Sequence, residues 1–393
     1  MEKRNVPKLR FKGFEDEWKK QNLNNIVERV VRKNKDSISN RPLTISAQYG
    51  LVDQEEFFNK IVASKNLEGY YLLNNGDFAY NKSYSNGYPF GAIKRLDRYE
   101  NGAVSTLYIC FKNRANTDSD FLVQYFETSR WHKEVSGIAV EGARNHGLLN
   151  ISVLDFFETI HRIPSLEEQT KIANFLSNID NVIEEQEGKV KDLEQYKKGM
   201  MQKIFKQEVR FRDENGGEYP EWEEKKLENI IINRKKGDIA NYSNKGNILL
   251  TNEYLEKKII KEILVSNEID VFSNHILILW DGSQAGKVYT GLKGVLGSTF
   301  VSIELNKFND NYFVYQYLNM KKHLIQEVWR EGSGVPHVAK DFLNKFKLKL
   351  PGLEEQTKIA NFLSNIDNII EEEKKKLEDL KLWKKGLLQQ MFV

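Results

Sequence analysis

The sequence predicts an α+β protein that contains two similar domains, each followed by a long helix. Three observations support this fold class. Residues 166–181 recur unchanged as residues 353–368. Apolar residues recur after each copy at three- and four-residue steps, as on one face of a helix. The regions before the two copies also have the same order of strand-like and helix-like segments. An identity of sixteen residues indicates duplication of one structural unit.

Length and composition exclude several classes of protein. The chain has 393 residues, 59 Lys and Arg against 56 Asp and Glu, and a net charge of only +3. This balance argues against a simple polybasic DNA binder. The only cysteine, Cys110, excludes a disulfide framework and a cysteine-based zinc site. No apolar run reaches the roughly 18 residues that span a membrane, and the first residues lack an apolar signal core. We therefore expect a cytoplasmic protein with no membrane contact.

A short lead-in is also repeated before each domain. Arg10 and Phe11 precede Trp18, and Arg210 and Phe211 precede Trp222, with the same Trp, Leu, Ile spacing afterwards. The repeat therefore predicts six segments. They are a lead-in at 1–23, a first domain at 24–163, a first helix at 164–206, a second lead-in at 207–222, a second domain at 223–350 and a second helix at 351–393.

Each repeated segment is expected to form one helix of about 40 residues, roughly 60 Å long. Pro164 and Pro351 precede the two helices, and polar residues near Glu187 and Glu373 interrupt each apolar seam. A long helix with one apolar stripe needs a partner, and the other copy is the one most available. A coiled-coil scaffold that binds only proteins remains an alternative. The candidate helix-pairing residues are Ile172, Phe175, Leu176, Ile179, Ile183, Leu193, Ile359, Phe362, Leu363, Ile366, Ile370 and Leu380.

The two domains share little sequence but the same succession of elements. Each has a β-rich run, a strand that enters a polar loop, a further strand, an amphipathic helix and a glycine loop. In the first domain these are 43–50, 77–87, 107–111, 120–134 and 141–147, and in the second 248–254, 276–287, 300–303, 311–328 and 331–337. One scaffold with two different surfaces suits the recognition of two targets in one ligand.

Polar and basic loop residues of these domains are the residue types that contact phosphates and base edges. A solvated surface role is the alternative for any one of them. The candidate DNA-binding residues are Ser46, Gln48, Tyr49, Lys82, Ser83, Tyr84, Lys94, Arg95, Arg98, Arg144, Asn145, His146, Thr251, Asn252, Tyr254, Ser283, Gln284, Lys287, Ser298, Ser333 and His337.

The motifs of a self-sufficient enzyme are missing. All seven prolines are isolated, so the Pro-Pro motif of amino-methyltransferases cannot occur. Residues 282–287 resemble a phosphate-binding loop but have one residue too few between the glycines, and Val288 stands where Ser or Thr would bind magnesium. The histidines show no metal spacing. We predict no catalytic residues and no metal site, and a self-contained nuclease or methyltransferase is the least favoured hypothesis.

The duplicated Leu-Glu-Glu-Gln-Thr-Lys-Ile-Ala helices, each after a proline, resemble the specificity (S) subunits of type I restriction–modification enzymes. The two lead-ins and the glycine loops are also similar to that family, and the resemblance covers essentially the whole chain. It implies two target-recognition domains separated by two antiparallel helices that form a coiled coil.

The resemblance also implies function and partners. Each domain would read one half of a bipartite, asymmetric site in double-stranded DNA, and helix length would set the unread spacer. Two modification subunits would dock on the helices and bind S-adenosylmethionine, while restriction subunits would use ATP and Mg for translocation and cleavage. The chain itself would bind no cofactor and catalyse nothing, because the flipped adenine would enter a pocket of the partner.

Overall fold

A computed structural model describes residues 5–60, 62–64, 66–84, 87–139, 149–256, 261–332 and 334–393. The chain forms two compact units. Unit 1 contains residues 1–187 and 376–393, and unit 2 contains residues 188–375. Each unit therefore combines one predicted domain with parts of both predicted helices.

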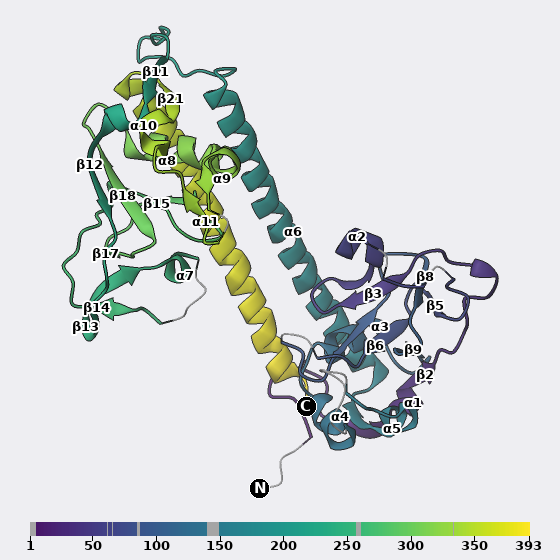
Figure 1. Ribbon diagram of the computed structural model, residues 1–393. Helices are drawn as coiled ribbons and strands as arrows, with labels where there is room; N and C mark the ends of the chain where they lie inside the picture. Colours follow the sequence, from purple (N-terminus) through teal and green to yellow (C-terminus); the bar gives the residue numbers. More distant parts are fainter. Residues whose placement is uncertain are drawn as a thin grey trace. The chain divides into compact units, whose positions relative to one another are not determined.

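A four-stranded antiparallel sheet lies at the centre of each unit (Figure 1). The strand order is β2-β9-β6-β7 in unit 1 and β12-β18-β15-β16 in unit 2. The prediction that the two domains share one fold is thus confirmed. The strands of unit 1 are β2 (Val27–Arg29), β9 (Ile109–Asn113), β6 (Phe78–Asn81) and β7 (Ala92–Arg95), and those of unit 2 are β12 (Ile231–Lys236), β18 (Phe300–Leu305), β15 (Ile276–Leu279) and β16 (Val288–Thr290).

Short helices pack on each sheet, and one prediction about them was wrong. The expected single helices at 120–134 and 311–328 are each two helices. In unit 1 the break lets Trp131 turn into the core, where its indole N–H donates to Phe126 O. In unit 2 the break at Lys321 allows Ile325 to reach the core. The helices are α3 (Ser119–Phe126), α4 (His132–Ile138), α5 (Val153–Glu158), α8 (Asn311–Met320), α9 (Lys322–Val328) and α10 (Phe342–Lys345).

The outer strands differ between the two units, although the central sheets agree. Unit 1 has two separate hairpin-like pairs, whereas unit 2 has a three-stranded sheet in which β13 and β17 are parallel. The divergence of sequence is therefore also a divergence of structure at this side of each domain. These strands are β3 (Leu43–Ser46), β4 (Gly50–Asp53), β5 (Tyr71–Asn74), β8 (Asn101–Val104), β13 (Tyr242–Leu250), β14 (Leu264–Val265) and β17 (Val295–Leu296).

The first and last strands of each domain pair with each other. β1 (Lys19–Asn22) pairs with β10 (Ile160–Ile163), and β11 (Glu223–Lys226) pairs with β21 (Lys347–Leu350). The strand before the domain thus pairs with the strand that leads into the long helix. The remaining elements are α1 (Leu23–Ile26), α2 (Gln54–Phe58), α7 (Asn252–Leu255), β19 (Arg330–Glu331), β20 (His337–Val338) and the 3-10 turns at Lys35–Ser37 and Leu227–Ile230.

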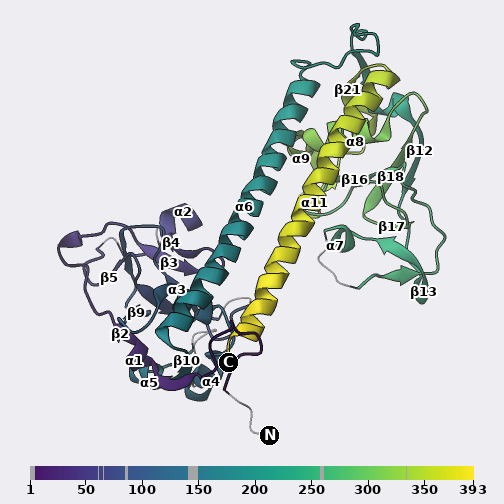
Figure 2. The same cartoon turned by 180° about the vertical axis from the view of Figure 1, so that it is seen from behind.

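The two long helices are α6 (Leu166–Phe205) and α11 (Leu353–Met391), close to the predicted bounds. In unit 1 the first half of α6 packs against the end of α11, with Leu176 and Phe392 in one core. In unit 2 the first half of α11 packs against the end of α6, with Leu363 and Phe205 in one core. The helices are therefore antiparallel in each unit (Figures 1 and 2). Among the described residues, no helix combines the length and apolar character that crossing a membrane requires.

Candidate nucleic-acid interface

The polar loop after β15 brings several predicted residues of unit 2 together. The backbone N–H of Gly282 donates to Pro336 O (2.8 Å), and the N–H of Asp281 donates to Thr299 O (3.1 Å). Asp281 also forms an isolated β-bridge with His337. The loop therefore lies beside the segments at 298–299 and 336–337. We call Ser283, Gln284, Ser298 and His337 the β15-loop surface.

Two cations of this surface were missed from the sequence. Lys236, at the end of β12, forms an ion pair with Asp281 (3.2 Å). Arg330 donates to the backbone O of Ser283 (3.4 Å). The signal for Lys236 was the basic run Arg234-Lys235-Lys236. The neighbouring Lys235 pairs with Asp270 (2.9 Å). No sequence signal placed Arg330 next to the loop, because the two are joined only by the fold.

A second group of predicted residues in unit 2 makes its contacts within the domain. Lys287 forms an ion pair with Glu256 (2.7 Å), and the hydroxyl of Tyr289 donates to the same carboxylate (2.6 Å). Burial, together with Glu256, raises the pKa of Tyr289, so its hydroxyl stays a donor. Thr251 caps α7 by accepting from Tyr254 N (3.2 Å). These contacts, with the nearby Asn252, fasten α7 to β16 and leave fewer groups for an external ligand.

The corresponding loop of unit 1 follows β6 and carries Lys82, Ser83 and Tyr84. The side chain of Lys82 donates to Ile151 O (3.3 Å), and partial burial lowers the pKa of Lys82. Tyr84 is exposed. Lys82 is thus turned inwards, and Tyr84 is the member of this group that faces solvent.

Lys94 and Arg95 of β7 make internal ion pairs, whereas Arg98 is exposed. Lys94 pairs with Glu127, and Arg95 pairs with Asp97 (2.6 Å) and Asp120 (2.7 Å). The side chains of Lys94 and Arg95 are only 13% and 17% exposed. They hold β7 against α3, so Arg98 is the cation of this group that is open to a ligand.

The hairpin between β3 and β4 carries the remaining candidates of unit 1. Ser46 is buried and accepts from the N–H of Tyr49 (3.2 Å), while Gln48 and Tyr49 are exposed. Four further predicted residues lie outside the described part of the chain. They are Arg144, Asn145, His146 and Ser333.

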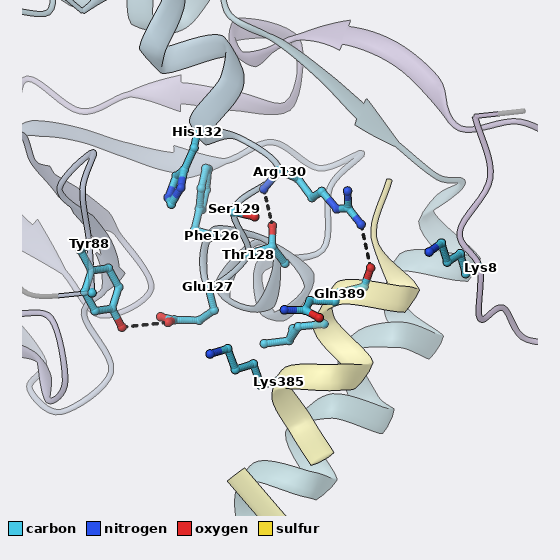
Figure 3. Close-up of a pocket in the computed structure, with 12 residues that line it drawn as sticks. Lys8, Tyr88, Phe126, Glu127, Thr128, Ser129, Arg130, His132, Lys385 and Gln389 are labelled. Carbon is cyan, nitrogen blue, oxygen red and sulfur yellow. Dashed lines mark hydrogen bonds between the residues drawn. The ribbon is translucent and has the colours of Figure 1, made fainter. Parts of the chain in front are cut away.

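One sizeable cavity of unit 1 lies away from these surfaces. A cavity of about 630 Å³ in unit 1 lies between α3, α4 and the end of α11 (Figure 3). Its walls include Glu127, which accepts from Tyr88 (3.2 Å), and Arg130, which donates to Gln389 O (2.7 Å). No predicted DNA-binding residue within the described part of the chain lines it. Among the described residues, no cluster of His, Cys, Asp and Glu could hold a metal ion.

The predicted helix-pairing residues are placed along both helices. Ile172, Leu176 and Ile179 are buried in the core of unit 1, and Phe175 and Ile183 pack at its edge. Ile359 and Leu363 are buried in the core of unit 2 with Phe362 at its edge, Ile366 and Ile370 are also buried, and Leu193 and Leu380 are half-buried.

Comparison with known proteins agrees with this architecture. Residues 212–382 match the family model described as the type I restriction modification DNA specificity domain. The MjaVIII specificity subunit of a type I restriction enzyme from Methanocaldococcus jannaschii is 35% identical over 196 residues. Parts of the chain are thus similar to the specificity subunits of type I restriction enzymes.

The curated relatives of this chain are matched over part of their length. The MjaVIII alignment covers 48% of this chain and 46% of the relative. A second sequence from the same organism, named for a type I enzyme MjaX specificity subunit, is 29% identical over 68% of this chain and 65% of its own length. The chain therefore spans less than two thirds of each relative.

Solved structures with a similar fold align over nearly the whole chain. The type I S subunit from M. genitalium aligns over 99% of both chains with a TM-score of 0.62 at 16% identity. A chain from a type I restriction–modification assembly study aligns over 96% of this chain and 98% of its own, with a TM-score of 0.57 at 16% identity. At this level of identity the likeness concerns the fold alone.

Proposed function

We propose that this chain is the DNA-binding specificity subunit of a type I restriction–modification complex. Each domain reads one half of a bipartite, asymmetric site, and α6 and α11 set the spacer between the halves. The observation that carries the proposal is the combination of identical central sheets with different outer strands. One scaffold with two surfaces is what recognition of two unlike half-sites requires.

The β15-loop surface supports a role in reading DNA. It presents the hydroxyls of Ser283 and Ser298 and the imidazole of His337 from three separate segments, beside the half-buried Gln284, whose Oε1 is enclosed. Amide and hydroxyl groups read base edges, and cations such as Lys236 and Arg330 contact phosphates. In unit 1, Tyr84, Arg98, Gln48 and Tyr49 offer the corresponding exposed groups.

The partners follow from the same proposal. Two modification subunits dock on the exposed faces of the long helices, and restriction subunits join that complex. In such a complex S-adenosylmethionine is bound by the modification subunits, and ATP and Mg by the restriction subunits. The chain itself contributes recognition and no catalysis.

Exchange of one domain tests the proposal. The chain is co-purified with its modification subunits, and methylated adenines are mapped before and after residues 24–163 are replaced by the domain of another specificity subunit. One half-site should change and the other should persist. The matched exchange of residues 223–350 should alter the opposite half. If both halves change, or neither does, the modular reading is wrong. Lack of DNA binding by the complex at low salt would favour the coiled-coil scaffold instead.

A further inference from the structure

An irregularity in β13 of unit 2 is not explained by the fold. Tyr242 and Asn247 both pair with Val265 of β14, so residues 243–246 have no partners in this register. We call residues 243–246 the β13 bulge. Bulges re-aim side chains away from a sheet and are frequent beside binding sites. All four bulge residues are exposed, and β13 and β14 lie at the opposite end of unit 2 from β11 and β21 (Figures 1 and 2).

Two large apolar side chains project beside the bulge. Ile239 is 86% exposed and Tyr242 is 75% exposed, although a solvated isoleucine contributes nothing to the domain core. Scattered apolar residues on a surface need no explanation. Here, however, both residues lie with Asn244 and Lys245 of the bulge in one short segment, residues 237–246, which we call the loop.

The loop that carries these side chains is held in a fixed conformation. The side chain of Asn267 accepts from Asn241 N (2.8 Å), and its amide donates to Ile239 O (3.4 Å). Ser266 N donates to Asn241 O (2.9 Å). Because these bonds fix the backbone on both sides of Ile239 and Tyr242, the exposed side chains lose little further backbone entropy on binding.

Close backbone contacts seat both ends of the loop. A Cβ atom on Gly237 would lie 2.0 Å from Gly297 O, and one on Gly246 would lie 2.1 Å from Val265 O. Gly246 also has φ +143°, which other residues rarely adopt. The N–H of Gly237 donates to Phe300 O (3.0 Å). Gly237 directly follows Lys236, which pairs with Asp281 beside the β15-loop surface.

We propose that Ile239 and Tyr242 form a wedge that inserts against a base-pair step of the half-site read by the second domain, with Asn244 and Lys245 in the adjoining groove. This inference rests on the proposed function. Apolar side chains flanked by Lys, Arg and Asn unstack and kink duplex DNA in this way. Asp270 and Asp281 are already neutralised by Lys235 and Lys236, and Arg234 and Lys245 make no ion pair among the described residues.

The outer strands of unit 1 have no such bulge among the described residues. The wedge therefore predicts an asymmetric complex. The half-site of the second domain contains an unstacked step, and the half-site of the first domain lacks the matching one.

The test uses the complex of the full chain with its modification subunits on a duplex that carries its mapped site. 2-Aminopurine is placed in turn at each position of both half-sites, except at the methylated adenines, which are themselves flipped. In wild type, fluorescence should rise at one step of the second half-site. The double variant I239A/Y242A should abolish that rise and weaken binding by about tenfold, the loss expected for a stacking contact.

Two matched variants separate insertion from a general surface effect. Tyr242→Phe keeps the ring and should retain the fluorescence rise. Phe308→Ala removes an equally exposed side chain of unit 2 (66% exposed) and should change neither signal nor affinity. The wedge proposal is overturned if 2-aminopurine fluorescence does not rise anywhere in the second half-site with the wild-type complex. It is also overturned if the rise in fluorescence persists in I239A/Y242A. A wild-type complex that selects no sequence overturns the proposed function, and the wedge with it.

Discussion

Lys384 near the end of α11 forms an ion pair with Asp180 of α6 within unit 1. The same pair occurs in unit 2, where Lys197 binds Asp367 (2.7 Å). Asp367 lies 187 residues after Asp180, and Lys384 lies 187 residues after Lys197. The duplication therefore uses each helix twice, with its aspartate in one unit and its lysine in the other.

Asp367 should matter more for stability than Asp180. Asp180 accepts from Lys384 and from Gln124 (2.7 Å), whereas Asp367 accepts from Lys197, from Gln316 (2.9 Å) and from Tyr312. We expect Asp367→Asn to reduce the free energy of unfolding of unit 2 by about 2–3 kcal/mol, and Asp180→Asn to reduce that of unit 1 by about 1 kcal/mol. Urea unfolding read by limited proteolysis and mass spectrometry distinguishes the two units.

The control for this prediction is an exposed ion pair of the same helices. Glu194 pairs with Lys374, and both side chains are nearly half exposed. Glu194→Gln should change stability by less than about 1 kcal/mol. Equal losses for Asp367→Asn and Glu194→Gln would contradict the role given to the buried partners of Asp367.

The two tryptophans of the lead-ins should differ in their response to mutation. Arg10 binds the buried carboxylate of Glu168, and Arg210 binds that of Glu355. The indole N–H of Trp222 also donates to Glu355 (3.2 Å), but the N–H of Trp18 has no partner among the described residues. Trp222→Phe should therefore destabilise its unit by about 1–2 kcal/mol more than Trp18→Phe, because only the former removes a hydrogen bond to a charged group. The difference between the two transitions in urea is the measurement, and a larger loss for Trp18→Phe would refute it.

Much of this architecture could be predicted from sequence because it rests on repetition. The duplicated 166–181 segment and the spacing after Trp18 and Trp222 identified both helices and both domain entries. The ion pairs of Lys94 with Glu127 and of Arg95 with Asp120 could not be predicted, because only the packing of α3 on β7 brings these residues together. A cation in sequence is equally compatible with an external phosphate and an internal carboxylate.

The bulge in β13 was missed for a related reason. Its register depends on β14, and nothing in the segment 242–247 except Gly246 indicates that four residues leave the ladder. The breaks between α3 and α4 and between α8 and α9 were missed because amphipathic periodicity continues across them. The sequence predicted those elements whose local pattern agrees with the tertiary packing. It did not predict features that tertiary packing alone determines.

Unit 1 should lose stability in mild acid because of His161. This histidine is buried, and the hydroxyl of Thr159 donates to Phe156 O (2.6 Å), so Thr159 must accept from Nε2–H of His161 (2.8 Å). Nδ1 is then the acceptor for the hydroxyl of Tyr125 (2.7 Å). A second proton on the ring would remove that acceptor. Burial accordingly lowers the pKa of His161 from 6.5 to about 4.

The direction of the pH effect follows from this pKa. Between pH 6.5 and 4 the unfolded chain binds a proton at His161 that folded unit 1 does not bind. The stabilisation by neutral His161 is therefore complete above pH 6.5 and falls as the pH approaches 4, by up to about 3 kcal/mol. His161→Leu should flatten this part of the profile while lowering stability at neutral pH. Leu348 holds the equivalent position of β21 in unit 2, which provides an internal reference. An unchanged pH slope in His161→Leu would exclude this residue as the source.

Substitutions on the β15-loop surface should separate affinity from specificity. The side chain of Gln284 is half-buried with Oε1 enclosed, so it must turn outward to form a paired set of hydrogen bonds with one base, whereas Lys236 offers only a charge. Gln284→Ala should relax selectivity at one position of the second half-site, with discrimination reduced by about 1–3 kcal/mol. Lys236→Ala should weaken binding to all sequences alike and reduce the salt dependence by about one phosphate contact. Lys94→Ala is the control, because the side chain of Lys94 is 13% exposed and paired with Glu127, so it should leave the salt dependence unchanged.

Titration of the complex on matched and single-mismatch duplexes at several salt concentrations gives all three results. If Gln284→Ala lowered affinity for every sequence equally, the amide would be a phosphate contact, and base reading by this loop would have to be assigned to Ser283 or His337.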